Sequence, residues 1–234
     1  MDVKLITRAK ELLRGFKGEN YAFGIGSLEK AAEFAKGYGE DCLVVANGGA
    51  WFKPVVDRLL ASLDANGVKL AGGRLVPDAQ PNAPREDVYR IATYILQHKP
   101  KSLMAVGGGS TIDAVKAANV LAALGRWEPE IEPYFGTGQV TAMLKEHSAA
   151  LLPVIAVQSA ASSGAHLTKY SNITDLAAGQ KKLIVDEAIV PPKAVFDYGV
   201  TRSVPKGMTV DGALDGISHC LEVFYGAKGA SYDL

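Results

Sequence analysis

The chain has 234 residues, of which 48% are hydrophobic and 21% are charged. This length allows one sizeable core and the beginning of a second, and this composition leaves little room for long disordered tails. The 25 Lys and Arg residues balance 25 Asp and Glu residues, which excludes the basic surplus typical of proteins that bind nucleic acid or an anionic membrane. A small-molecule partner is therefore favoured.

The two cysteines, Cys42 and Cys220, lie in no paired metal or redox spacing, so a disulfide framework is not expected. Residues 1–14 form an amphipathic pattern. No apolar run approaches the roughly 20 residues that a membrane span needs. We therefore expect a cytoplasmic protein with neither a nucleic acid nor a membrane as its partner.

Short β-rich runs alternate with helix-like stretches in the first half of the chain. Residues 42–46 predict a strand before a helix at 53–66, and residues 102–106 predict a strand before a helix at 111–124. This alternation is typical of βα units around a parallel sheet. Residues 84–87 have the composition of a first helical turn and predict a helix that leads into the second of these strands.

The second half of the chain changes character twice. Further strand-like runs are 154–157, 170–174, 182–185 and 194–196. We expect them to extend the same domain. Apolar periodicity over 208–225 then predicts a helix. The sequence thus predicts an α/β domain at 1–202 and the start of an all-α second domain at 203–234, which is too short for an independent core.

The most informative segment directly follows the second predicted strand. Gly107, Gly108 and Gly109 lack the Cβ atoms that would keep a phosphate away, and the helix beyond them directs unpaired N–H groups and a positive dipole end to the same place. Ser110 can add a hydroxyl, and Asp113 can accept a bond from a ribose hydroxyl. The segment predicts a pyrophosphate site. A plain tight turn remains the alternative, because the Gly-x-Gly-x-x-Gly spacing is absent.

The motif of residues 107–116, Gly-Gly-Gly-Ser-x-x-Asp-x-x-Lys, resembles the hallmark of iron-containing (group III) alcohol dehydrogenases and of their relatives glycerol dehydrogenase and dehydroquinate synthase. Residues 21–29 are similar to an early glycine turn of that family, and the resemblance continues almost to the C-terminus. It implies a Rossmann-like, parallel-sheet α/β domain of the dehydroquinate synthase type. That domain would bind NAD or NADP and precede a helical domain that binds Fe²⁺ or, alternatively, Zn²⁺.

The resemblance also assigns cofactor contacts outside the glycine turn. Ser159 and Ser163 match cofactor-contacting threonines, and Lys181 matches a cofactor-contacting lysine. Asn47 stands where NAD-preferring members place an aspartate that binds the adenosine ribose. Without that carboxylate a 2′-phosphate is not repelled. We therefore expect Asn47 to contact the cofactor and NADP to be tolerated or preferred.

Asp215 and His219 lie four residues apart in the last predicted helix, so their side chains share one face and can bind one divalent ion. An ordinary surface pair has the same spacing, but the resemblance matches the two residues to family metal ligands. Two further histidine ligands would come farther downstream, and none of His98, His147 and His166 matches one. The resemblance therefore implies an incomplete metal site in a truncated chain, with poor metal retention and little or no turnover.

Taken together, the resemblance implies an NAD(P)-dependent and metal-dependent alcohol dehydrogenase that transfers hydride between an alcohol and an aldehyde or ketone. A homodimer is possible. One alternative is a glycerol or polyol dehydrogenase or a dehydroquinate synthase-like enzyme, and Asp215 argues against the synthase, where a glutamate is usual. Another is a non-catalytic nucleotide-binding remnant.

Overall fold

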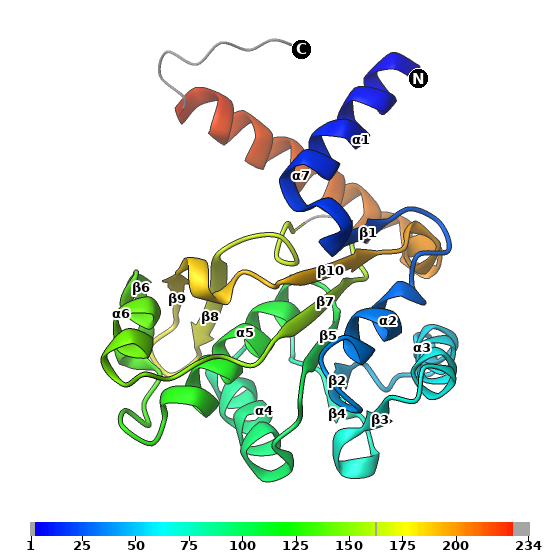
Figure 1. Cartoon of the computed structure of the whole chain (residues 1–234). Helices are drawn as coiled ribbons and strands as arrows, with labels where there is room; N and C mark the ends of the chain where they lie inside the picture. Colours follow the sequence, from blue (N-terminus) through cyan, green and yellow to red (C-terminus); the bar gives the residue numbers. More distant parts are fainter. Residues whose placement is uncertain (1–2, 162, 227–234) are drawn as a thin grey trace.

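The computed structural model describes residues 3–161 and 163–226 (Figure 1). The chain folds around a seven-stranded sheet with the order β1-β10-β7-β5-β2-β3, in which β4 also pairs with β2. Every pair of strands in this sheet is parallel. The strands are β1 (Tyr21–Phe23), β2 (Asp41–Ala46), β3 (Lys69–Leu70), β4 (Val76–Pro77), β5 (Leu103–Gly107), β7 (Val154–Gln158) and β10 (Lys193–Phe196). The predicted parallel α/β sheet is confirmed.

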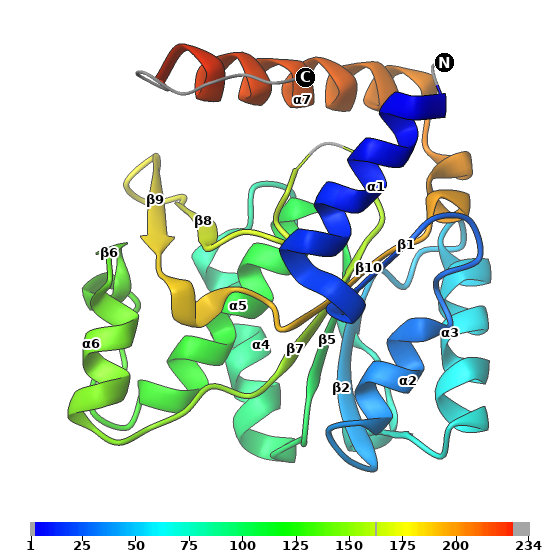
Figure 2. The same cartoon turned by 45° about the horizontal axis from the view of Figure 1, so that its top comes forward.

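Helices cover both faces of this sheet, as Figures 1 and 2 show. They are α2 (Lys30–Lys36), α3 (Lys53–Ala65), α4 (Arg85–His98), α5 (Gly109–Leu124) and α6 (Gln139–Glu146). Along β2, Leu43 and Val45 belong to the core shared with α4 and α5, whereas Cys42 and Val44 belong to the core shared with α2 and α3. Burial on both faces explains why the strand is a continuous apolar run.

A second, smaller sheet has the order β6-β9-β8. It consists of β6 (Gly136–Thr137), β8 (Tyr170–Asp175) and β9 (Gln180–Val185), and β8 and β9 form an antiparallel pair. Two of the strand-like runs in the second half of the sequence therefore leave the main sheet. They still pack on its core, because Ile173 and Ile184 belong to the same apolar cluster as α4 and α5.

Two long helices lie outside these layers. α1 (Val3–Lys17) has no buried residue, and α7 (Lys206–Gly226) has Gly212 as its one buried residue in the described part of the chain. Figure 2 shows α7 lying across the carboxyl ends of the parallel strands. The helix expected at 208–225 is thus present, but the domain boundary at 203 stays a prediction, because α7 builds no second core.

The described residues also include five short 3₁₀ helices: Gly18–Asn20, Ala71–Gly73, Glu132–Tyr134, Glu187–Ile189 and Tyr198–Ser203. Within residues 3–161 and 163–226, none of the helices combines the length and apolar character that crossing a membrane requires.

Candidate functional site

The turn between β5 and α5 contains glycines in two different situations. A Cβ atom on Gly107 would lie 2.6 Å from Thr111 Oγ1, and one on Gly109 would lie 2.7 Å from Ser163 Oγ. A side chain at either position would therefore force Thr111 or Ser163 to move. Gly108 has room for a Cβ atom, which would make an ordinary contact at 3.6 Å with the side chain of Ala160.

The N-terminus of α5 begins at this turn without a side-chain cap. Gly108 has the extended backbone angles φ −82° and ψ −168° and has no side chain to bond the first helical turn. The first N–H groups of a helix have no partner within the helix and lie at the positive end of its dipole. The turn therefore presents hydrogen-bond donors suited to an anion such as a pyrophosphate.

The segment after β7 lies beside the same turn. Gln158 pairs with Gly107 across the sheet, and Ser159 N donates to Gly107 O at 2.9 Å. The Gln158 amide donates to the carbonyl of Ser163 at 3.1 Å and also to that of Ala160. The buried hydroxyl of Ser163 has no hydrogen-bond partner among the described residues. A hydroxyl of this kind beside a helix N-terminus suits a ligand contact.

A second loop reaches the start of α5 from the end of β4. Asn82 N donates to Ser110 Oγ at 3.0 Å. Thr174 of β8 holds the loop, since its Oγ1 donates to Asn82 O at 2.7 Å and its N donates to Ala83 O at 3.0 Å. Asn82 and Ala83 have positive φ angles of 66° and 48°. Ser110 thus holds the loop that contains Asn82 and Ala83 against the start of α5.

Asp113 and Lys116 of the glycine motif are both buried. Asp113 Oδ2 accepts from Asn172 N at 3.0 Å, and its buried Oδ1 lies 3.9 Å from Lys116 Nζ with no hydrogen-bond partner among the described residues. Lys116 Nζ donates to the carbonyls of Thr168 and Tyr170, both at 2.8 Å. Burial raises the pKa of Asp113 to about 6 and lowers the pKa of Lys116 to about 8, against their mutual attraction. Both residues therefore join α5 to β8.

The raised pKa of Asp113 predicts a pH-dependent contribution to stability. Between about pH 4 and pH 6 the folded chain holds a proton that the unfolded chain has released, so this contribution is present below pH 4 and is lost as the pH rises through 6. We expect the wild type to lose stability relative to Asp113→Asn over this range in urea denaturation. Asp175→Asn is the control of opposite sign, because hydrogen bonds from Ala178 N and Arg85 lower the pKa of Asp175. A difference between wild type and Asp113→Asn that is constant with pH would contradict the assignment.

The β8–β9 hairpin places Lys181 on the side of the site. Lys181 is exposed, and it shares one face of β9 with Leu183, which pairs with Asn172 of β8. Leu183, Asn172 and Asp113 line a cavity of about 620 Å³ beneath α7. Lys182 faces the other way and pairs with two carboxylates. Lys181 is thus the cation that the hairpin presents on the cavity side.

Asn47 lies directly after β2, at the same edge of the sheet as the glycine turn. Its Oδ1 accepts from Gly49 N at 2.8 Å, and its Nδ2 donates to Asp78 Oδ2 at 3.1 Å. Asp78 follows β4, which pairs in parallel with β2. The structure therefore places a carboxylate beside Asn47 that the sequence pattern did not indicate.

Several residues of the site were missed from the sequence. Asp78, Asn82, Asn172 and Thr174 reach it through strand pairing or loop docking between distant segments. A local signal exists for Asn82, because Asn is enriched at positive φ angles.

His166 is buried against Tyr21, with 3.1 Å between its Nε2 and the Tyr21 hydroxyl. Burial lowers the pKa of His166 to about 4.

Comparison with known sequences decides the family. A sequence model of the iron-containing alcohol dehydrogenases matches residues 18–198, a range that includes every strand of the main sheet. The chain belongs to the iron-containing alcohol dehydrogenase family. The resemblance seen in the glycine motif is therefore confirmed.

Two alcohol dehydrogenases that this chain is similar to are longer than the chain. It is 32% identical to the NAD-dependent methanol dehydrogenase of Bacillus methanolicus over 157 residues, which are 67% of this chain and 38% of that relative. It is 26% identical to the NADPH-dependent butanol dehydrogenase of Clostridium saccharobutylicum over 208 residues, which cover 86% of this chain and 49% of that relative.

Among solved structures, the NADH-dependent butanol dehydrogenase A of Thermotoga maritima superposes with a TM-score of 0.73 at 27% identity, covering 87% of this chain and 48% of that one. The chain spans about half the length, or less, of each of these three relatives.

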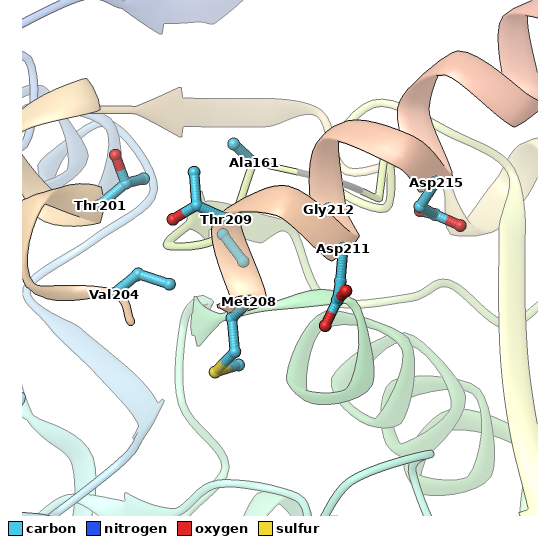
Figure 3. Close-up of a pocket in the computed structure, with 9 residues that line it drawn as sticks. Ala161, Thr201, Val204, Met208, Thr209, Asp211, Gly212 and Asp215 are labelled. Atoms are coloured by element: carbon cyan, nitrogen blue, oxygen red, sulfur yellow. The ribbon is translucent and has the colours of Figure 1, made fainter. Parts of the chain in front are cut away.

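In this member of the iron-containing alcohol dehydrogenase family, Asp215 and His219 of α7 form the candidate metal pair. Asp215 Oδ1 lies 3.7 Å from His219 Nε2, and the two side chains are 47% and 59% exposed. Asp215 lines a cavity of about 350 Å³ with Ala161 and Asp211 (Figure 3), whereas His219 lines the larger cavity beside Asp113. Over residues 3–161 and 163–226, no group of three or more His, Cys, Asp or Glu side chains could hold a metal. The pair supplies suitable donors but too few for a tightly held ion.

Proposed function

We propose that this chain binds a nicotinamide dinucleotide and forms the cofactor-binding part of an NAD(P)-dependent alcohol dehydrogenase. The carrying observation is the uncapped N-terminus of α5, where Gly108 has no side chain and the unpartnered hydroxyl of Ser163 lies beside Gly109. Backbone N–H groups and a hydroxyl donor are the chemistry that a pyrophosphate needs. Names of relatives that include NAD-dependent and NADPH-dependent alcohol dehydrogenases support the same reaction class.

Each part of the proposed site has a separate task. The glycine turn binds the pyrophosphate, and exposed Lys181 adds a cation for its oxygens. Asn82 and Thr174 hold the loop beside Ser110 in place. When bound, the nicotinamide ring supplies the acceptor or donor of hydride for a small alcohol or aldehyde.

The metal donors that this chain offers are Asp215 and His219. Asp215 and His219 suit Fe²⁺ or Zn²⁺ by their chemistry, but two exposed donors on one helix leave the other coordination positions to water. The proposal for this chain is cofactor binding with weak metal retention and little or no turnover.

Titration calorimetry with NADH and NADPH tests the proposal. We expect saturable 1:1 binding of at least one form, and after dialysis from Fe²⁺ or Zn²⁺ we expect much less than one ion per chain. Lys181→Met should weaken binding about tenfold, roughly 1.4 kcal/mol, whereas Lys145→Met, an exposed lysine at the end of α6, should not. Folded chain that binds neither form would refute cofactor binding. Stoichiometric metal with ordinary alcohol oxidation would refute weak retention.

A further inference from the structure

A carboxylate lies two strands away from the glycine turn on the same edge of the sheet. In the parallel register Ala46 of β2 pairs with Val106 of β5 on one side and with Pro77 of β4 on the other. The next residues, Gly107, Asn47 and Asp78, are therefore neighbours along the carboxyl edge of the sheet. With strands about 4.8 Å apart, Asp78 lies about 10 Å from Gly107 across this edge.

The two sides of the glycine turn differ, and this difference indicates on which side the nicotinamide and the adenosine of a bound dinucleotide would lie. The cavities of about 350 and 620 Å³ lie on the side of the segment after β7, between that segment and α7. Small-molecule and cofactor sites are concave, so we place the reactive nicotinamide in this hollow. The adenosine half, which leaves the pyrophosphate in the other direction, then extends over the ends of β2 and β4.

Asp78 is held in a fixed position with one oxygen free. The guanidinium of Arg90 donates to the backbone carbonyls of Pro77 at 2.9 Å and of Asp78 at 2.8 Å. Asn47 is itself oriented by Gly49 N and donates its amide to Asp78 Oδ2 at 3.1 Å. Within the described part of the chain, Asp78 Oδ1 accepts no hydrogen bond, and the side chain is half-buried.

Nearby cations do not neutralise this carboxylate. The Arg90 side chain pairs with Asp87 Oδ1 at 2.7 Å, and Lys53, the first residue of α3 beyond the Asn47 loop, pairs with Asp57 at 2.6 Å. Asp78 therefore presents an uncompensated negative charge and a free acceptor oxygen at the place where the adenosine ribose would lie.

We propose that Asp78 selects NAD over NADP. Its free oxygen accepts a hydrogen bond from a hydroxyl of the adenosine ribose, and its charge repels a 2′-phosphate at the same place. The inference rests on the proposed cofactor site. It replaces the expectation, drawn from Asn47 alone, that NADP is tolerated or preferred, because Asp78 supplies from β4 the carboxylate that β2 lacks.

The test is titration calorimetry of NADH and NADPH with the wild type, Asp78→Asn and Asp64→Asn. We expect the wild type to bind NADH at least tenfold more tightly than NADPH. Asp78→Asn keeps the shape of the side chain and should reduce this ratio about tenfold, mainly through tighter NADPH binding. Asp64→Asn removes the same charge from an exposed site at the end of α3 and should leave the ratio unchanged.

The outcomes separate this inference from the function on which it rests. Equal affinity of the wild type for both forms, or an unchanged ratio in folded Asp78→Asn, would overturn the role of Asp78 while cofactor binding stands. An equal change in Asp64→Asn would overturn it too, since the effect would then be one of net charge. Binding of neither form would instead refute the proposed function, and thermal denaturation of each variant confirms that it is folded.

Discussion

Gly108→Val is expected to lower dinucleotide affinity at least 100-fold, about 2.8 kcal/mol, without unfolding the protein. The backbone angles of Gly108 are ordinary for an L-residue, and a Cβ atom there would make only a normal contact, at 3.6 Å to Ala160. A branched side chain would nevertheless occupy the space between the start of α5 and the segment after β7. A phosphate could then no longer reach the N–H groups of the helix. Titration calorimetry measures the affinity, and circular dichroism measures the melting temperature.

Two other glycines are the controls for this substitution. Gly15→Val places the same side chain in open space on α1 and should leave dinucleotide affinity unchanged. Gly107→Val forces a side chain against Thr111 and should lower the melting temperature, which would distinguish loss of fold from loss of site. Wild-type affinity in Gly108→Val would show that the phosphates do not bind at this turn.

Lys116→Met is expected to destabilise the fold by about 3–5 kcal/mol, because it leaves the buried carboxylate of Asp113 without its cation. The substitution keeps the length of the side chain but also removes the donor from the carbonyls of Thr168 and Tyr170. For a chain of this size such a loss corresponds to a melting temperature lower by roughly 10 °C. Urea denaturation measures the free energy of unfolding directly.

Lys181→Met is the matched control, because Lys181 is exposed and should leave the free energy of unfolding unchanged. A second control tests whether Asp113 and Lys116 depend on each other. In the Asp113→Asn background, Lys116→Met should lower the free energy of unfolding by less than it does in the wild type, since no buried charge is then left unpaired. A melting temperature of Lys116→Met within about 2 °C of the wild type would show that the buried lysine contributes little to stability.

Local patterns were sufficient for the main elements of the fold. β5, the glycine turn and α5 follow one another without interruption. An apolar run predicts the strand, the glycines predict the turn, and the apolar spacing after them predicts the helix, so each signal comes from adjacent residues. The helix expected from residue 111 begins at Gly109, two residues earlier, within the usual uncertainty of helix ends. α7 was found for the same reason, since its apolar spacing is local.

The glycine motif alone does not show whether each of its residues is exposed or buried. Asp113 and Lys116 lie three residues apart on α5, and this spacing is equally compatible with a binding face and a packing face. Contact with β8, more than 50 residues away along the chain, decides that both are buried. The orientation of Lys181 depends in the same way on the register of the β8–β9 pair.

The amino-acid sequence by itself determined the βα order, the glycine turn and its family, because these depend on the composition of neighbouring residues. Only the tertiary structure decided which side chains share a site. Asp78 and Asn47 are 31 residues apart in the chain, and they meet because β4 pairs in parallel with β2. Pairing between strands is a non-local choice set by the packing of the whole sheet, so the carboxylate beside Asn47 appears only in the fold.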